Sequence, residues 1–148
     1  AAFADLYWRA MMRSGDATLA AIAAKSEKES AYHVRHSSEW IIRLGDGTDE
    51  SHRRAQAAID GLWAFTGEMF AVDDSERGLI DAGIAVDPAT LRAQWLKLVS
   101  DVVSEATLSL PANDWMQQGG RSGRHSEHLG HLLSELQSMQ RTFPGATW

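Results

Sequence analysis

Apolar residues recur every three or four positions along several stretches of the chain, the spacing that lines up side chains on one face of an α-helix. No stretch shows the strict apolar–polar alternation of a half-buried strand. The pattern predicts an all-α fold, with helices over residues 2–14, 16–44, 49–70, 88–110 and 125–141. Residues 73–84 are a polar connection with one or two helical turns. Long antiparallel helices joined by short turns favour a helical bundle.

Capping and turn residues support these boundaries. Asp16, Thr48 and Asp87 each precede a helical stretch, and their side-chain oxygens can accept hydrogen bonds from the free amides of a first turn. The segments 45–47 (Gly-Asp-Gly) and 144–145 (Pro-Gly) are turn signals that end helices. We therefore expect one domain spanning residues 1–148.

The composition agrees with a single globular domain. The chain has 148 residues, of which 44% are hydrophobic, and a formal net charge of −6, which argues against nucleic-acid binding. It has no cysteine, which excludes disulfides, iron–sulfur clusters and thiolate zinc sites. No apolar run reaches the ~20 residues of a membrane span, and no secretory signal is visible, so we expect a cytoplasmic protein. Because the sequence starts without Met inside a helical stretch, we also expect a fragment that lacks N-terminal helices of a longer subunit.

Polar residues interrupt the apolar stripe of the helix predicted over residues 16–44. The stripe reads Leu19, Ile22, Ser26, Glu29, His33, His36 and Trp40. The last predicted helix places His125 and His128 on the line of its leucines, beside Glu127. Glutamate and histidine facing into a bundle are the ligand types of a carboxylate-bridged di-iron site, in which two helices each supply a Glu-x-x-His pair.

The spacing of these residues does not complete such a site. The chain has nine glutamates, and none is followed three positions later by histidine. Glu29/His33 and Glu127/His131 are four apart, which suits a salt bridge or hydrogen bond at least as well. Two interpretations stay open, a bound metal and a buried polar network. We favour the network, with no catalytic or metal-ligating residue in this chain, formed by Glu29, His33, His36, His125, Glu127 and His128.

Specific motifs run along the whole chain. They are Lys28-Glu29-x-x-Tyr32-His33, residues 43–48, Leu62-Trp63-x-x-Thr66-x-Glu68-x-Phe70, residues 83–88 and 105–108, Gly119-Gly120-Arg121-x-Gly123-x-His125-x-Glu127-His128-Leu129-Gly130, and Pro144-Gly145-x-x-Trp148. Together they resemble the C-subunit family of bacterial phenylacetyl-CoA epoxidases. The resemblance covers the later part of the family's chain.

The resemblance implies a ferritin-like fold and a place in a multicomponent monooxygenase of aerobic phenylacetate degradation. In such complexes the A subunit carries the di-iron centre, and a separate reductase delivers electrons from NADPH. The C subunit pairs with the A subunit and stabilises it, so no cofactor is expected in this chain. Three positions before His33 and His128 stand Ser30 and His125, so the acid of a Glu-x-x-His pair is absent at both, in agreement with a non-catalytic role.

Two basic segments are candidates for contact with the nucleotide tail of an acyl-CoA at the subunit interface. One is the glycine-rich loop at residues 119–124, with Arg121 and Arg124, whose backbone amides and charges suit phosphate. The other is a turn at Arg77, Gly78 and Leu79. A flexible connection is the simpler interpretation of the loop, which lacks Walker spacing.

Rival functions lead to different expectations. A di-iron oxidase or oxygenase would use Glu29, His33, Glu68, Glu127 and His128, whereas a ferritin-type iron store would form a cage-sized homo-oligomer. Most tryptophans are expected in the core, and Trp148 is expected to dock on the domain or on a partner. A bundle without its first helices would leave apolar stripes uncovered, which calls for an interface.

Overall fold

The computed structural model describes residues 1–112 and 115–147. It divides into two compact units, Ala1–Met116 and Gln117–Trp148, and each is described by itself. All regular elements in the described ranges are α-helices or 3-10 turns. The prediction of an all-α, ferritin-like helical bundle is confirmed.

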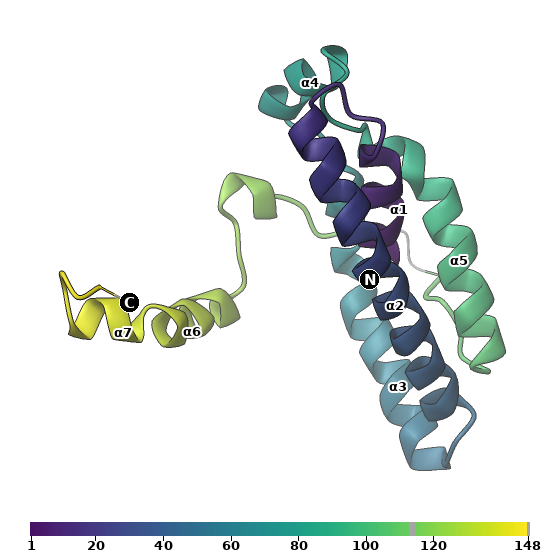
Figure 1. Cartoon of the computed structure of the whole chain (residues 1–148). Helices are drawn as coiled ribbons and strands as arrows, with labels where there is room; N and C mark the ends of the chain where they lie inside the picture. The colour runs from purple at the N-terminus through teal and green to yellow at the C-terminus, as the bar shows by residue number, and fades with distance from the viewer. Residues whose placement is uncertain (113–114, 148) are drawn as a thin grey trace. The chain divides into compact units, whose positions relative to one another are not determined.

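The first unit is built around one long helix. Its helices are α1 (Ala2–Met11), α2 (Ala17–Gly45), α3 (Asp49–Leu62), α4 (Asp74–Asp81) and α5 (Arg92–Glu105). In Figure 1, α2 runs the length of this unit, with α1 antiparallel beside its first half and α3 beside its second half. Short 3-10 turns at Trp63–Phe65, Gly67–Phe70 and Pro88–Leu91 connect these helices.

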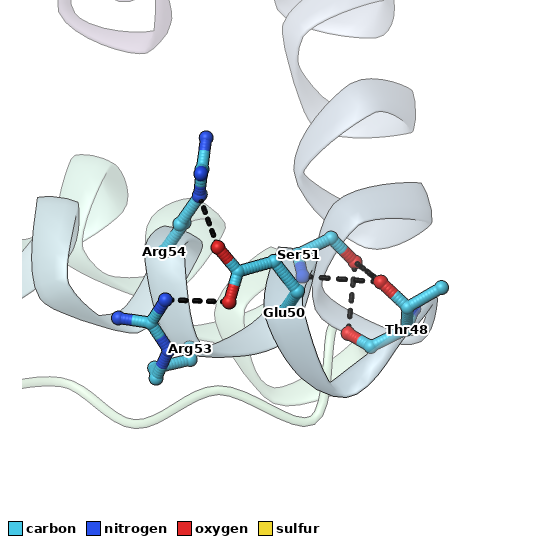
Figure 2. Close-up of polar contacts among 5 residues, drawn as sticks. All are labelled: Thr48, Glu50, Ser51, Arg53 and Arg54. Atoms are coloured by element: carbon cyan, nitrogen blue, oxygen red, sulfur yellow. Dashed lines mark hydrogen bonds and ion pairs between the residues drawn. The ribbon is translucent and has the colours of Figure 1, made fainter.

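Side-chain caps start three of the helices. The Oδ1 atom of Asp16 accepts hydrogen bonds from the amides of Thr18 and Leu19, at 2.8 and 2.9 Å, and so satisfies two free donors of α2. Thr48 and Ser51 form a capping box at the start of α3 (Figure 2). The Asp16 and Thr48 caps confirm the predicted helix starts. Asp73 caps α4 in the same way, within the predicted polar connection.

Next to the Thr48 cap, two arginines hold the carboxylate of Glu50. Figure 2 shows Arg53 and Arg54 donating to its two oxygens, with 2.7 Å from Arg54 Nε to Oε1. These hydrogen bonds lower the pKa of Glu50 below its ordinary 4.5, because they favour the charged carboxylate. The bond from Arg53 has the larger effect and the bond from Arg54 the smaller one. The charge also lies in the first turn of α3, where the helix dipole favours an acid.

Two predicted helices are shorter than their sequence pattern suggested. The helix expected over 49–70 ends at Leu62, because the chain then turns through two 3-10 segments that bring aromatic rings to α5. Trp63 stacks on Trp95 at 5.6 Å between ring centroids, and Phe70 meets Trp95 edge-on at 5.2 Å. The helix expected over 88–110 begins as a 3-10 turn and ends at Glu105.

The end of α5 has a specific cause. Thr107 adopts a left-handed conformation with φ of 60°, and the amide of Leu108 bonds back to the carbonyl of Val103 at 3.0 Å. This is the Schellman arrangement that closes helices, here built on threonine instead of glycine. A non-glycine residue at positive φ is costly, so the surrounding packing must hold this turn in place.

The first unit has two hydrophobic clusters. One contains Leu6, Phe70, Leu91 and Trp95, and α1 contributes to it. The other contains Ala55, Val103, Ala106 and Leu108. Val99 of α5 packs against both clusters, so the core continues along α5.

The second unit is smaller. It contains a 3-10 turn at Gly120–Ser122 and the helices α6 (Glu127–Leu136) and α7 (Ser138–Thr142). The single helix predicted over 125–141 is therefore interrupted at Gln137. Three leucines of α6 remain exposed, Leu132 to 55%, Leu133 to 38% and Leu136 to 65%, and Leu129 is half-buried. Trp148, for which docking was predicted, lies outside the described residues.

Candidate functional site

The polar residues predicted along the long helix lie together on one face of α2. We call Glu29, Tyr32, His33, His36 and Trp40 the α2 polar face. His33 Nε2 lies 3.9 Å from Glu29 Oε1, as the four-residue spacing predicted. Their side chains are 54% and 74% exposed, so this contact is weak and open to solvent.

Aromatic rings form a continuous row on the same face. Tyr32 stacks on His36, with 5.8 Å between ring centroids and 17° between planes, and His36 meets Trp40 at 6.4 Å. Arg35 lies 5.5 Å over the Tyr32 ring and Arg43 lies 5.7 Å over the Trp40 ring. Such cation–π contacts contribute about 0.5–1 kcal/mol each at exposed positions and hold the rings in place. The result is a preformed aromatic and basic surface.

Burial on α2 follows a different line of residues. The buried positions are Ala23, Ser30 and Gly45, all small, and they allow neighbouring backbones to approach closely. Ser30 stands three residues before His33, where a Glu-x-x-His pair would need its acid, and it is only 7% exposed. The α2 polar face therefore points away from the packed side of the unit. The predicted burial of Glu29, His33 and His36 is not produced by this unit alone.

The C-terminal half of the predicted network belongs to the second unit. Glu127 and His128 lie in the first turn of α6, His125 precedes that helix, and all three are exposed. Because the two units are described separately, the network that joins these residues to Glu29 and His33 stays a prediction.

Within each unit taken by itself, the described residues do not bring these side chains together as a metal site. Within residues 1–112 and 115–147, no group of three or more His, Asp or Glu side chains gathers in a way that would hold a metal ion. Glu29 and His33 face each other, and the position that would supply the missing acid is a buried serine. Glu68, which the rival oxidase interpretation used, lies in the separate 3-10 segment Gly67–Phe70.

The two basic candidates for acyl-CoA contact have different local structures. Arg77, Gly78 and Leu79 do not form the predicted turn but lie inside α4, because the Asp73–Glu76 capping box starts a helix there. The loop at residues 119–124 does turn sharply, with φ of 98° at Gly119 and 84° at Gly123. The side chain of Arg124 packs over Gly119, so this loop has a defined shape. Contact of either segment with an acyl-CoA stays a prediction.

The first unit has an open apolar groove, which the sequence did not single out. It has a volume of about 870 Å³ and lies between α2, α3 and α5. Its walls are mainly aliphatic, including Ile41, Ile59, Leu62, Val99 and Val102. Leu62 is 65% exposed there. The signal in the sequence was the apolar stripe of each helix, but the stripes do not reveal which of them stay uncovered.

A tight helix junction was also missed. At the end of α2 the carbonyl of Gly45 accepts from His52 Nδ1 at 2.7 Å and from Thr107 Oγ1 at 3.3 Å. Since a carbonyl can only accept, His52 carries its proton on Nδ1. His52 therefore has a structural role at the end of α2. The junction fastens α2, α3 and the end of α5 together.

The helical bundle makes this an all-α, ferritin-like protein, and sequence comparisons identify its family. Residues 1–148 match the family described as phenylacetic acid catabolic protein, and the chain belongs to that family. It is 49% identical over 138 residues to the C subunit of 1,2-phenylacetyl-CoA epoxidase from Escherichia coli (strain K12). That match covers 93% of this chain but only 56% of the relative, so the chain spans little more than half the relative's length. No helix in the described ranges is both long and apolar enough to cross a membrane.

Proposed function

We propose that this chain is part of a non-catalytic subunit of a phenylacetyl-CoA epoxidase. In this role it pairs with the di-iron catalytic subunit and stabilises it, while a separate reductase supplies electrons from NADPH. The proposal is supported by family membership and by 49% identity to a protein named as the C subunit of such an epoxidase. A cytoplasmic location goes with this role.

The observation that carries the non-catalytic role is the acid missing before His33. A ligand pair on one helix needs glutamate and histidine three residues apart, so that both side chains reach the same metal. Here the acid position is Ser30, which packs inside the unit, and the neighbouring Glu29 lies four residues before His33 instead of three. The same acid is absent before His128, where residue 125 is histidine.

The α2 polar face is the surface we assign to pairing with the catalytic subunit. Aromatic side chains and arginine are the residue types enriched at the centres of protein interfaces. Tyr32 and Trp40 are 52% and 49% exposed, yet their rings are already held by stacking and by arginine. Little conformational entropy is then lost when a partner covers them.

Reconstitution of the enzyme tests this role. The catalytic subunit and reductase are assayed for phenylacetyl-CoA-dependent NADPH oxidation, with and without this subunit. We expect activity to require the subunit. Because Glu29 and His33 belong to the proposed pairing surface, the double variant Glu29→Gln/His33→Gln is added at a concentration that saturates assembly. Its complex should then turn over within about twofold of wild type, because neither side chain holds the metal. The matched control is Glu135→Gln, another exposed glutamate on a helix. If the double variant assembles normally but abolishes turnover, the chain takes part in the chemistry and the proposal is wrong.

A further inference from the structure

The exposed side chains of α2 are arranged symmetrically about His36. Tyr32 and Trp40, both aromatic, stand four residues to either side of it. Glu29 stands seven residues before His36, and Arg43, whose guanidinium lies over the Trp40 ring, stands seven residues after it. At equal distances from His36 the helix therefore carries side chains of matching shape or of opposite charge.

A third pair of residues follows the same rule. His33 stands three residues before His36, and the acid Glu39 stands three residues after it. All of these positions are exposed, so within the described part of the first unit this face of α2 is open to solvent. The loose contact between Glu29 and His33 leaves both side chains accessible to a further partner.

The central residues form a seam along α2. Glu29, Tyr32, His36, Trp40 and Arg43 follow one another at steps of three and four residues, which keeps them on one side of the helix. The seam extends for about 21 Å at 1.5 Å per residue. Two helices that pack along such seams have axes about 8–10 Å apart, a distance that these side chains can bridge.

A two-fold axis at His36 makes this seam complementary to itself. The axis brings two copies of α2 together antiparallel, so each residue meets the one that stands equally far on the other side of His36. Glu29 then meets Arg43 of the second copy, and Tyr32 meets Trp40 of the second copy, each pair occurring twice. In a parallel arrangement each side chain would meet its own copy, and the like charges at Glu29 and at Arg43 would repel.

We propose that two copies of this chain pair through the α2 polar face, antiparallel about a two-fold axis at His36, when the catalytic subunit is not bound. One helix seam buries less than about 1,200 Å², the range of weak and reversible complexes. We therefore expect a dissociation constant on the order of tens of micromolar. The proposed function assigns the same face to the catalytic subunit, which would displace the second copy; only this exchange rests on the proposed function.

Charge reversal tests the register of the pair. The dissociation constant of the purified subunit is measured by sedimentation equilibrium for the wild type, Glu29→Arg, Arg43→Glu and the double variant. Each single reversal should raise the dissociation constant at least about tenfold, because like charges then meet twice across the axis. The double variant restores opposite charges at both places, so its dissociation constant should return to within about threefold of wild type.

The net charge of the chain cannot produce this result. From the formal net charge of −6, Arg43→Glu lowers the charge by two units and Glu29→Arg raises it by two, yet both should weaken the pair. Lys97→Glu on α5 is the matched control, because it lowers the charge as Arg43→Glu does at another exposed position. It should leave the dissociation constant unchanged.

Disulfide cross-linking locates the axis independently of the charges. The chain has no cysteine, so His36→Cys places a single thiol on the axis, where it meets its own copy. His33→Cys is the control on the same face. Its two copies would lie six residues apart along the paired helices, about 9 Å, which is too far for a disulfide. Under mild oxidation His36→Cys should form linked dimers at least about tenfold faster.

Several results would overturn the proposal. These are a wild type that stays monomeric up to about 1 mM, single reversals that pair as tightly as wild type, and a double variant that stays as weak as the single ones. Equal cross-linking of His36→Cys and His33→Cys would show association without this register and would also refute it. All of these measurements use the subunit alone, so their failure is distinct from failure of the non-catalytic role in the reconstitution assay.

Discussion

The junction at the end of α2 leads to a sharp prediction for Gly45→Ala. Gly45 is buried in the last turn of α2, and a Cβ added there would lie 2.1 Å from the carbonyl oxygen of Ala106 and 2.9 Å from its Cβ. Both are part of a closely packed backbone contact, so no flexible side chain can move out of the way. Either α2 or the end of α5 has to shift.

The magnitude follows from three contributions. Overpacking costs about 1–3 kcal/mol. The shift also strains the hydrogen bonds that Gly45 accepts from His52 and Thr107, each contributing about 1 kcal/mol. Against this, alanine is favoured over glycine by about 1 kcal/mol within a helix. The net destabilisation is about 2 kcal/mol, or a melting temperature lower by about 4–8 °C for a chain of this size.

The assay is thermal unfolding of the purified protein, with Gly61→Ala as the matched control. Gly61 also lies near the end of a helix, α3, but a Cβ added there meets no atom within 4 Å. That variant should be unchanged or more stable by up to about 1 kcal/mol. If Gly45→Ala is as stable as the control, the close approach of α2 to Ala106 is incorrect.

Three further variants test other parts of the account. Glu50→Gln should lower the melting temperature near neutral pH. Since the pKa of Glu50 is lowered in the folded state, its contribution is present above its ordinary 4.5 and disappears as the pH falls through the folded-state pKa, so the melting curves should converge in acid. Trp40→Ala should change folding stability by less than about 0.5 kcal/mol but weaken binding of the catalytic subunit by about 2 kcal/mol in calorimetric titration; unchanged affinity would remove the α2 polar face from the interface. Arg121→Ala/Arg124→Ala should raise the acyl-CoA dissociation constant of the assembled complex about tenfold, and an unchanged constant would discard a role in binding the nucleotide tail.

Helix starts were predictable from the sequence, and helix ends less so. The caps at Asp16 and Thr48 depend on a few adjacent residues, so the local sequence specifies them. The end of α3 at Leu62 depends on the rings of Trp63 and Phe70 meeting Trp95 from a distant segment. That contact overrides a helical pattern that continues to residue 70.

The sequence predicted that Glu29 and His33 share one face of α2, but not which face of that helix packs against the rest of the unit. The four-residue spacing of Glu29 and His33 correctly placed them on one face. The packed side of α2 carries Ala23, Ser30 and Gly45, small residues that a search for large apolar side chains passes over. Close backbone approach, as at Gly45, selects small residues, and only the folded chain shows where it occurs.

Iron analysis of the separated subunits tests the central claim most directly. The complex of this subunit with the catalytic subunit is purified, the chains are separated under conditions that retain metal, and iron is counted on each by mass spectrometry. The account predicts that iron stays with the catalytic subunit and that this subunit binds far less than one iron per chain. Stoichiometric iron on this subunit, lost in the Glu29→Gln/His33→Gln variant, would contradict it.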